Sequence, residues 1–418
     1  MIALAHGIGE VEGLPLPGEL VLQTGGVVVL VSFLAVALLW RQPRFTGPVR
    51  GRPLPPALGR VLDAPALRTV LQTITLLVAA GVVGVGLLGP QDPDANPAPR
   101  ALYVLFWVGL VPASLLFGPV WRAVNPLRLL HRLAAAALGV KPTGMVALSA
   151  RLGYRPAAVG LAAFVWLELV APGHERPGVV AGFLLGYAVV HTAAAVRYGT
   201  AWFDRGDAFE TYSALTGALA PVGRLADGRL GLRNPLRGLA AVAVAPGLVA
   251  FLAVWWGSTV FDGLVGWVGW STVRQTMPVP AVLLDTVVLA ALTLLVALVY
   301  RAATGTAAAV LASTLIPIAV GYTIAHYATL LLIEGPRGLT QLLPPGAPLG
   351  PITAVPAPGL VAAVQIAAVL AGHVVAVVAA HDRCVELLPE HRRLADQVPL
   401  VLLMVAYTMV GLFLLVIS

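Results

Sequence analysis

Long runs of apolar residues recur along the whole chain, and a shorter polar segment separates each run from the next. Runs such as 27–40 and 398–417 contain no charged side chain. About 20 such residues form one membrane-crossing α-helix, whereas the strands of a membrane β-barrel alternate between apolar and polar residues. The pattern therefore predicts an all-α, polytopic transmembrane helix bundle.

The apolar runs predict about ten spans. They lie at 20–40, 66–88, 101–121, 156–170, 178–196, 238–256, 281–300, 306–332, 359–380 and 398–417. The fourth run is short, so a re-entrant or interfacial helix is an alternative interpretation of it. We expect a single integral membrane domain, residues 1–418, that spans the lipid bilayer of the plasma (inner) membrane several times.

Basic residues predict the orientation of the spans. All but four of the 26 Lys and Arg residues fall in alternate loops, which the positive-inside rule assigns to the cytoplasm. The exceptions are Arg100, Arg176, Arg274 and Arg337. Both termini are therefore expected outside. The same division predicts an extracytoplasmic segment 1–19, a cytoplasmic loop 197–237 and a Pro-rich extracytoplasmic loop 333–358.

Composition agrees with a membrane protein, because 59% of the residues are hydrophobic and only 11% are charged, against about 25% in soluble domains. The isoelectric point near 10.0 does not indicate nucleic-acid binding, since the basic residues flank apolar runs instead of gathering on one face. The single cysteine, Cys384, excludes an intrachain disulfide and a thiolate metal cluster.

Small residues and prolines predict features of helix packing. Gly182 and Gly186 form a small-xxx-small pattern, which lets a neighbouring helix approach closely. Pro112, Pro246 and Pro317 interrupt the third, sixth and eighth runs. Each proline frees backbone carbonyls that protein or water must satisfy.

Ionisable side chains within the spans are few, and each costs about 2.5–3.5 kcal/mol at the membrane centre, so each needs a partner or a role. Glu168, Asp285 and His326 are expected in the outer half of the membrane, and Asp262 and His6 can reach the same level. These residues predict an outward-facing His/Asp/Glu cluster. In it, Asp285, His326 and His6 bind a divalent zinc, manganese or iron ion, and Glu168 and Asp262 are catalytic.

A purely structural interpretation of this first group stays open. His326 would then hydrogen-bond a carbonyl freed near Pro317, and Asp285 would pair with a local partner. Ligands scattered over several helices leave no local spacing pattern that distinguishes the two interpretations.

A second candidate cluster lies nearer the cytoplasmic side. His373 is expected near the middle of its span, and His381 and Asp382 at the end of it. The two histidines differ by two helical turns in depth, so they need a third element to share a metal. The alternative is a solvated helix end with local ion pairing. His131, in a basic loop, is expected at the surface.

Several short segments together carry a family resemblance. They are Ala5-His6-Gly7-Ile8-Gly9, Leu14-Pro15-Leu16-Pro17, Trp202 with Gly206-Asp207-Ala208-Phe209, Phe261-Asp262-Gly263, Ala325-His326-Tyr327 with Glu334-Gly335, Ala371-Gly372-His373-Val374 and Ala380-His381-Asp382-Arg383. Over nearly its whole length the chain resembles actinobacterial multispanning membrane proteins labelled fenitrothion hydrolase. The resemblance implies hydrolysis of the aryl ester bond of an organophosphorothioate triester, an apolar small molecule.

Three functional hypotheses follow. In the hydrolase, a metal hydroxide held by His326 and Asp285 attacks phosphorus, with Glu168 or Asp262 as general base. In a proton- or ion-coupled transporter, Asp285, His326 and Glu168 form a proton or ion relay. In a non-catalytic or cofactor-binding subunit of a membrane complex, His326 and His373 are packing or cofactor residues.

Overall fold

The structure is a computed structural model, which describes residues 18–343, 357–387 and 397–417. Nearly all of its regular structure is helical, which confirms the predicted all-α bundle. Within the described ranges, seven helical segments are long and apolar enough to cross a bilayer. The chain is therefore a multispanning membrane protein. Residues 1–17 of the predicted N-terminal segment and 344–356 of the predicted Pro-rich loop lie outside these ranges.

In the first half of the chain, the described residues from 18 onward form eleven helical elements and one strand. They are α1 (Gly18–Leu39), β1 (Gly51–Pro53), α2 (Pro56–Asp63), α3 (Pro65–Leu88), the π-helix η2 (Arg100–Val108), α4 (Leu110–Phe117), α5 (Val120–Val124), α6 (Pro126–Ala137), α7 (Arg155–Leu169), α8 (Pro177–Tyr198), α9 (Ala201–Arg205) and α10 (Ala208–Gly217). The second half contains β2 (Val222–Arg224), β3 (Leu230–Arg233), α11 (Pro235–Ala240), α12 (Leu248–Gly266), α13 (Val268–Thr276), α14 (Ala281–Thr304), η3 (Gly305–Ala307), α15 (Ala308–Leu311), η4 (Ala312–Leu315), α16 (Ile316–Leu342), α17 (Pro358–Leu387) and α18 (Val398–Ile417).

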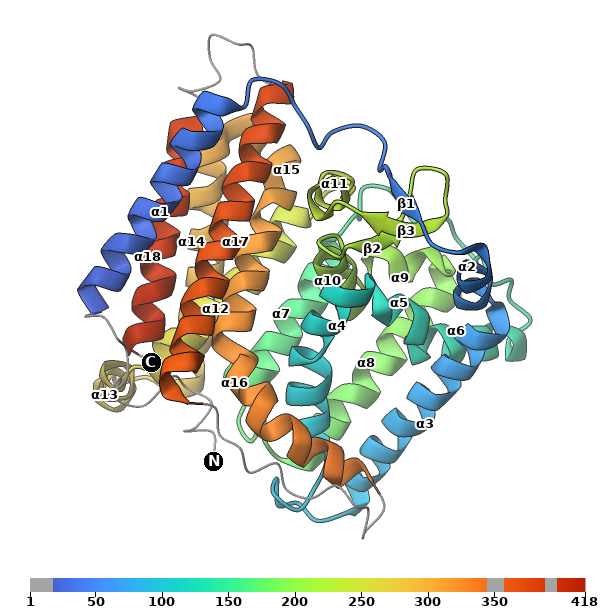
Figure 1. Ribbon diagram of the computed structural model, residues 1–418. Coiled ribbons are helices and arrows are strands. Elements are labelled where there is room, and N and C mark those ends of the chain that lie inside the picture. Colours follow the sequence, from blue (N-terminus) through green and yellow to red (C-terminus); the bar gives the residue numbers. More distant parts are fainter. Residues whose placement is uncertain (1–17, 344–356, 388–396, 418) are drawn as a thin grey trace.

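The long helices form two adjoining groups (Figure 1). One group contains α1, α12, α14, α16, α17 and α18, and the other contains α3, α4, α6, α7 and α8. Packing of α12 against α7, and of α16 against η2, joins the two groups. The strands form a small antiparallel sheet in the order β1-β3-β2 at one end of the bundle, where Gly51 pairs with Arg233 and Val222 with Leu232.

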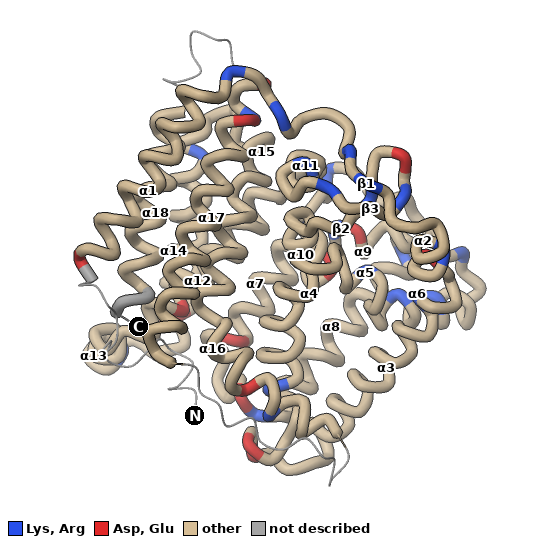
Figure 2. The backbone as a smooth tube through the Cα atoms, viewed as in Figure 1, with Lys and Arg blue, Asp and Glu red and all other residues tan. Residues whose placement is uncertain are grey.

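Charge is divided along the bundle. Figure 2 shows most Lys and Arg residues toward the end that carries the sheet. Arg100, one of the four exceptions found in the sequence, lies in the opposite set of loops and is neutralised there by Glu334 and Asp94, each at 2.8 Å. This separation agrees with the predicted sorting of basic loops. That the basic end faces the cytoplasm stays a prediction.

The sixth predicted span, 238–256, is wrong in its boundaries. The helix there is α12, Leu248–Gly266, and a break separates it from the short α11. Pro246 cannot continue a helix, and Gly247 adopts a left-handed conformation with φ of 87°. The amide of Tyr154 donates to the Pro246 carbonyl at 2.7 Å, so this carbonyl has a partner at the break between the two helices. Asp262, expected in a loop or at a helix end, consequently lies within α12.

Two further segments differ from the predicted boundaries. The eighth run starts with the short elements η3, α15 and η4, and the long helix α16 begins only at Ile316. That helix continues to Leu342, so the first ten residues of the predicted loop 333–358 are helical. The loop 197–237 holds α9, α10, β2 and β3, and α10 is buried along most of its length. The fourth run does form a helix, α7, of 15 residues.

Glycines allow close helix contact at a different place from the one expected. A Cβ atom at Gly182 or Gly186 would meet nothing within 4 Å, so the predicted role of this pattern in packing is wrong. In contrast, a Cβ atom at Gly372 of α17 would lie 2.5 Å from the Pro317 carbonyl of α16, and one at Gly321 would lie 2.5 Å from the Ala368 carbonyl. Small residues therefore permit the contact between α16 and α17.

We expect Gly372→Ala to lower the thermal stability of the purified protein in detergent, because the added methyl group forces α16 and α17 apart. Overpacking of this kind costs about 1–3 kcal/mol. Gly182→Ala is the matched control, and its melting temperature should stay unchanged or rise, since Ala favours a helix over Gly. Equal melting temperatures for the two variants would contradict the assigned contact.

Candidate functional site

Asp262 of α12 forms a buried polar group with two side chains of α16. The Tyr327 hydroxyl donates to Asp262 Oδ2 at 2.6 Å, and His326 Nε2 lies 2.8 Å from the same oxygen. All three residues are buried, with exposed fractions of 4% for Asp262, 5% for His326 and 7% for Tyr327. We call Asp262, His326 and Tyr327 the Asp262 site. It joins a carboxylate, an imidazole and a phenol within two membrane-spanning helices.

Aromatic side chains surround the Asp262 site. The Tyr322 ring lies nearly parallel to the His326 ring, at 5.9 Å between centroids and 13° between planes. Two turns before Asp262 in α12, Trp255 donates its indole N–H to the Thr323 hydroxyl at 3.1 Å. Bulky rings thus exclude bulk water from the polar atoms, and electrostatic interactions between the polar groups are stronger in such an environment.

Glu168, a predicted catalytic residue, lies near the end of α7 within electrostatic range of the Asp262 site. The charge of the Glu168 carboxylate acts on Asp262 and on Tyr327. Glu168 as a whole is half-buried. Two negative carboxylates at this range repel each other in a low-dielectric environment. A proton or another cation bound near them lowers this repulsion, so the arrangement favours uptake of positive charge.

Asp285, predicted as a metal ligand, has other partners. Its carboxylate accepts a hydrogen bond from the Trp270 indole at 3.2 Å and lies 3.1 Å from the Arg274 guanidinium. Both residues belong to α13, so Asp285 fastens that short helix to α14. This is the local pairing that the sequence left open as an alternative.

The described ranges contain no group of three or more His, Cys, Asp or Glu side chains placed to hold a metal ion. His6, the third predicted metal ligand, lies outside these ranges. A divalent ion at this level therefore stays a prediction, and the described residues by themselves do not form a three-ligand site.

The second predicted cluster separates into two places. His373, in α17, directs Nδ1 to the Val369 carbonyl at 2.9 Å, and its Nε2 is buried. His381 and Asp382 instead contact the segment after α1, where His381 Nε2 donates to the Trp40 carbonyl at 3.0 Å. Both are nearly fully buried, so the alternative of a solvated helix end is wrong.

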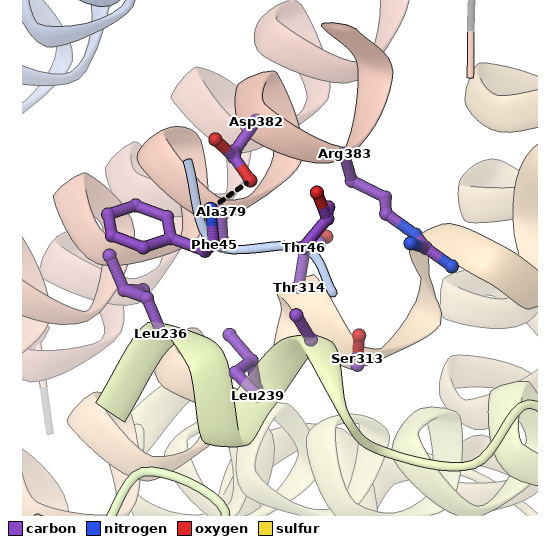
Figure 3. A pocket seen from close by; sticks show the side chains of 10 residues that line it. Phe45, Thr46, Leu236, Leu239, Ser313, Thr314, Ala379, Asp382 and Arg383 are labelled. Atoms are coloured by element: carbon purple, nitrogen blue, oxygen red, sulfur yellow. Dashed lines mark hydrogen bonds between the residues drawn. The ribbon is translucent and has the colours of Figure 1, made fainter. Parts of the chain in front are cut away.

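Asp382 fixes the chain between α1 and β1. Its Oδ1 accepts from the Trp40 indole at 3.1 Å and from the Arg44 amide at 2.6 Å, and its Oδ2 accepts from the Phe45 amide at 3.1 Å. Figure 3 shows Asp382 and Phe45 beside a cavity of about 20 Å³ that Leu236, Leu239, Ser313 and Thr314 also line. Such a cavity has room for about one water molecule, so the contacts of Asp382 are structural in character.

A third group of polar and charged side chains surrounds the start of α10, in the predicted cytoplasmic loop, where the sequence indicates the acidic residues Asp204, Asp207 and Glu210 but not their partners. Asn125 donates through Nδ2 to Asp207 at 2.9 Å and to Glu210 at 3.0 Å, and Arg128 donates to Glu210 at 2.9 Å. Asp207 caps the start of α10 by accepting from the Phe209 amide. The spacing of Asp207 and Glu210 matches the N-cap and N3 positions of a helix start, a signal that could have revealed α10. The polar residues of α10 instead favoured the prediction of a loop.

His131 also differs from expectation. It is completely buried in α6, with its ring edge toward Phe203, and is not a surface residue. Burial lowers the pKa of this histidine, and the neighbouring Arg128 and Arg132 lower it further. A neutral imidazole avoids an additional buried positive charge next to two arginines.

Comparison of the chain with protein-family profiles, with curated protein sequences and with solved structures finds no match. The fold and the three buried polar groups therefore carry the functional argument.

We expect Asp382→Ala to destabilise the protein by about 1–3 kcal/mol, because the Arg44 and Phe45 amides lose their buried acceptor. Trypsin should also cleave the 41–50 segment faster. Asp227→Ala, which removes the exposed partner of Arg229, is the control and should leave both the melting temperature and the cleavage rate unchanged. Equal behaviour of the two variants would show that Asp382 does not hold this segment.

Proposed function

We propose that this protein is a multispanning plasma-membrane protein that transfers protons, alone or coupled to a solute, and that the Asp262 site binds and releases the transferred proton. One observation carries the proposal. Asp262, buried in a membrane-spanning helix, shares one oxygen between His326 at 2.8 Å and Tyr327 at 2.6 Å. Ionisable residues inside membrane helices usually mark ion or proton paths.

The chemistry of the partners supports proton transfer. Carboxylate, imidazole and phenol groups each accept and release protons, and the hydrogen bonds of the Asp262 site already connect them. Glu168 adds a second carboxylate whose charge acts on Asp262. Glu168 lies one residue before the end of α7, at the end of that helix that the sequence predicts outside, so it extends the group toward the predicted outer surface.

We expect Asp262→Asn to slow proton flux into proteoliposomes by about tenfold or more, since proton transfer by a positioned group contributes about 10²–10⁴-fold to a rate. Flux is measured with an internal pH-sensitive dye under a potassium diffusion potential. The matched control is Asp285→Asn, which alters a buried carboxylate of α14 that Arg274 of α13 holds. This variant should keep wild-type flux.

A strictly coupled transporter would show no flux without its solute, so proton exchange at Asp262 needs a direct measurement. Infrared difference spectra between acidic and alkaline buffer should contain a carboxyl band that Asp262→Asn removes and Asp285→Asn retains. Failure of both the flux and the infrared result would refute the proposal.

Hydrolysis is the second candidate function, and the hydrogen bond between His326 and Asp262 favours it. A carboxylate that orients an imidazole allows the imidazole to act as a general base. In an aryl phosphorothioate triester, a water molecule would give a proton to the imidazole and attack phosphorus, and the aryl oxide would leave. The membrane concentrates such apolar substrates near the helices.

The hydrolase candidate predicts release of the aryl alcohol from fenitrothion by purified protein, and loss of that release in His326→Gln. Added chelator tests the predicted zinc, manganese or iron ion, because metal-dependent hydrolysis would stop and metal-free hydrolysis would continue. Wild-type protein that releases no more product than the His326→Gln variant would exclude this activity.

A further inference from the structure

Helix α10 is a buried helix that carries polar side chains through the protein interior. Every residue from Ala208 to Gly217 except Ala214 is buried. The helix packs against α4, α5, α7, α9 and α16 (Figure 1). Half of its ten residues are polar, namely Glu210, Thr211, Tyr212, Ser213 and Thr216. This composition is unusual for a helix with so little exposure.

Three hydroxyl groups of α10 stand out. Ser213 bonds to the Ser114 hydroxyl at 2.9 Å, whereas the buried hydroxyls of Thr211 and Thr216 have no hydrogen-bond partner among the residues that the structure describes, and the Tyr212 hydroxyl faces only the Thr323 side chain of α16. Buried polar groups in proteins are nearly always hydrogen-bonded, and internal water commonly supplies the partner. These hydroxyls therefore indicate hydration along α10.

One end of this polar row reaches the surface at the basic end of the bundle. Glu210 pairs with Arg128, and Arg128 also contacts Asp204 at 3.2 Å. The Asp204 side chain is 46% exposed, so the network connects a buried carboxylate with solvent. Burial raises the pKa of Glu210 above the ordinary glutamate value, although Arg128 opposes the shift. Protonation of Glu210 is therefore easier than that of an exposed glutamate.

The other end of the row reaches the Asp262 site. The Tyr212 ring stacks on Trp107 at 4.3 Å and packs against Trp255 at 4.5 Å. Tyr212 interacts electrostatically with Glu168 and with Tyr327, the residue that donates to Asp262. Its hydroxyl thus lies between the charged groups of α10 and the Asp262 site.

We propose that α10 provides the route by which protons pass between the basic surface of the bundle and the Asp262 site. Protons move from Asp204 and Glu210 past the Thr211 hydroxyl to Tyr212, and from there to Tyr327 and Asp262. Successive helix residues differ by about 100° in direction, so Thr211 lies between the faces that carry Glu210 and Tyr212. Each hydroxyl or water accepts one proton and releases another, which leaves no net change on the route.

The inference rests on the proposed proton transfer at Asp262, and Tyr212→Phe tests it separately. This change removes only the hydroxyl that faces Thr323, and it keeps the ring between Trp107 and Trp255. Folding should therefore be unaffected. We expect Asp262-dependent proton flux in proteoliposomes to fall about tenfold, as for loss of one proton-transfer group. Thr211→Val, which keeps the side-chain shape, is the second variant and should reduce flux in the same direction.

Tyr300→Phe is the matched control, because it removes another buried tyrosine hydroxyl, one that donates to the Ala308 carbonyl in α15. All fluxes are expressed per amount of protein that elutes as a monodisperse peak. Wild-type flux in Tyr212→Phe and Thr211→Val, together with loss of flux in Asp262→Asn, would refute the route and leave the proposed function intact. Flux that Asp262→Asn does not lower, together with the absence of an infrared band that Asp262→Asn removes, would refute both. If wild-type flux is no faster than in protein-free liposomes, the rate of the Asp262 infrared change after a pH jump is measured instead, and equal rates in the wild type, Tyr212→Phe and Thr211→Val would refute the route.

Discussion

Polar groups that membrane helices bring into the bilayer must find partners inside the protein, because lipid offers none. The buried carboxylates of this protein meet that constraint with donors from remote parts of the chain. Asp382 is bound by Trp40, which lies 342 positions earlier, and Asp262 is bound by His326, 64 positions later. Leaving such an acceptor without its donor is costly, so each bond restricts which helices can be neighbours.

The buried carboxylates differ in the kind of donor that they receive. Asp382 accepts from two backbone amides and the Trp40 indole, and Asp207 accepts from backbone amides, the Asn125 amide and the Tyr187 phenol. Both carboxylates fix a local chain segment. Asp262 receives a phenol and an imidazole, and both groups can take part in proton transfer. Neither burial nor a single phenol donor therefore separates a structural carboxylate from a reactive one. Asp262 differs from Asp207 and Asp382 because one of its oxygens receives both an imidazole and a phenol.

The sequence predicts the fold class because twenty-residue apolar runs admit one solution in a bilayer. It also assigns Glu168, Asp262 and His326 to one level of the membrane, and the structure places these three within electrostatic range. Depth is only one coordinate, however. The sequence does not reveal which helix faces which, so Asp285 was assigned to His326 although Arg274 and Trp270 hold it. The hydropathy pattern likewise predicts one continuous helix through Pro246 and Gly247, whereas the local backbone geometry there ends one helix and starts another.

Irregular helices gather around the polar interior of the bundle. The π-helix η2 ends beside α4, short elements precede α16, and α10 occupies a buried position without crossing the membrane as a long helix. Broken or short helices at membrane depth persist only where protein or internal water satisfies their backbone groups. A bundle built only for stability would favour continuous apolar helices in these places. Trp107 belongs to the π-helix η2 and stacks on Tyr212 of the short helix α10, so irregular and short helices supply side chains that link α10 to the Asp262 site.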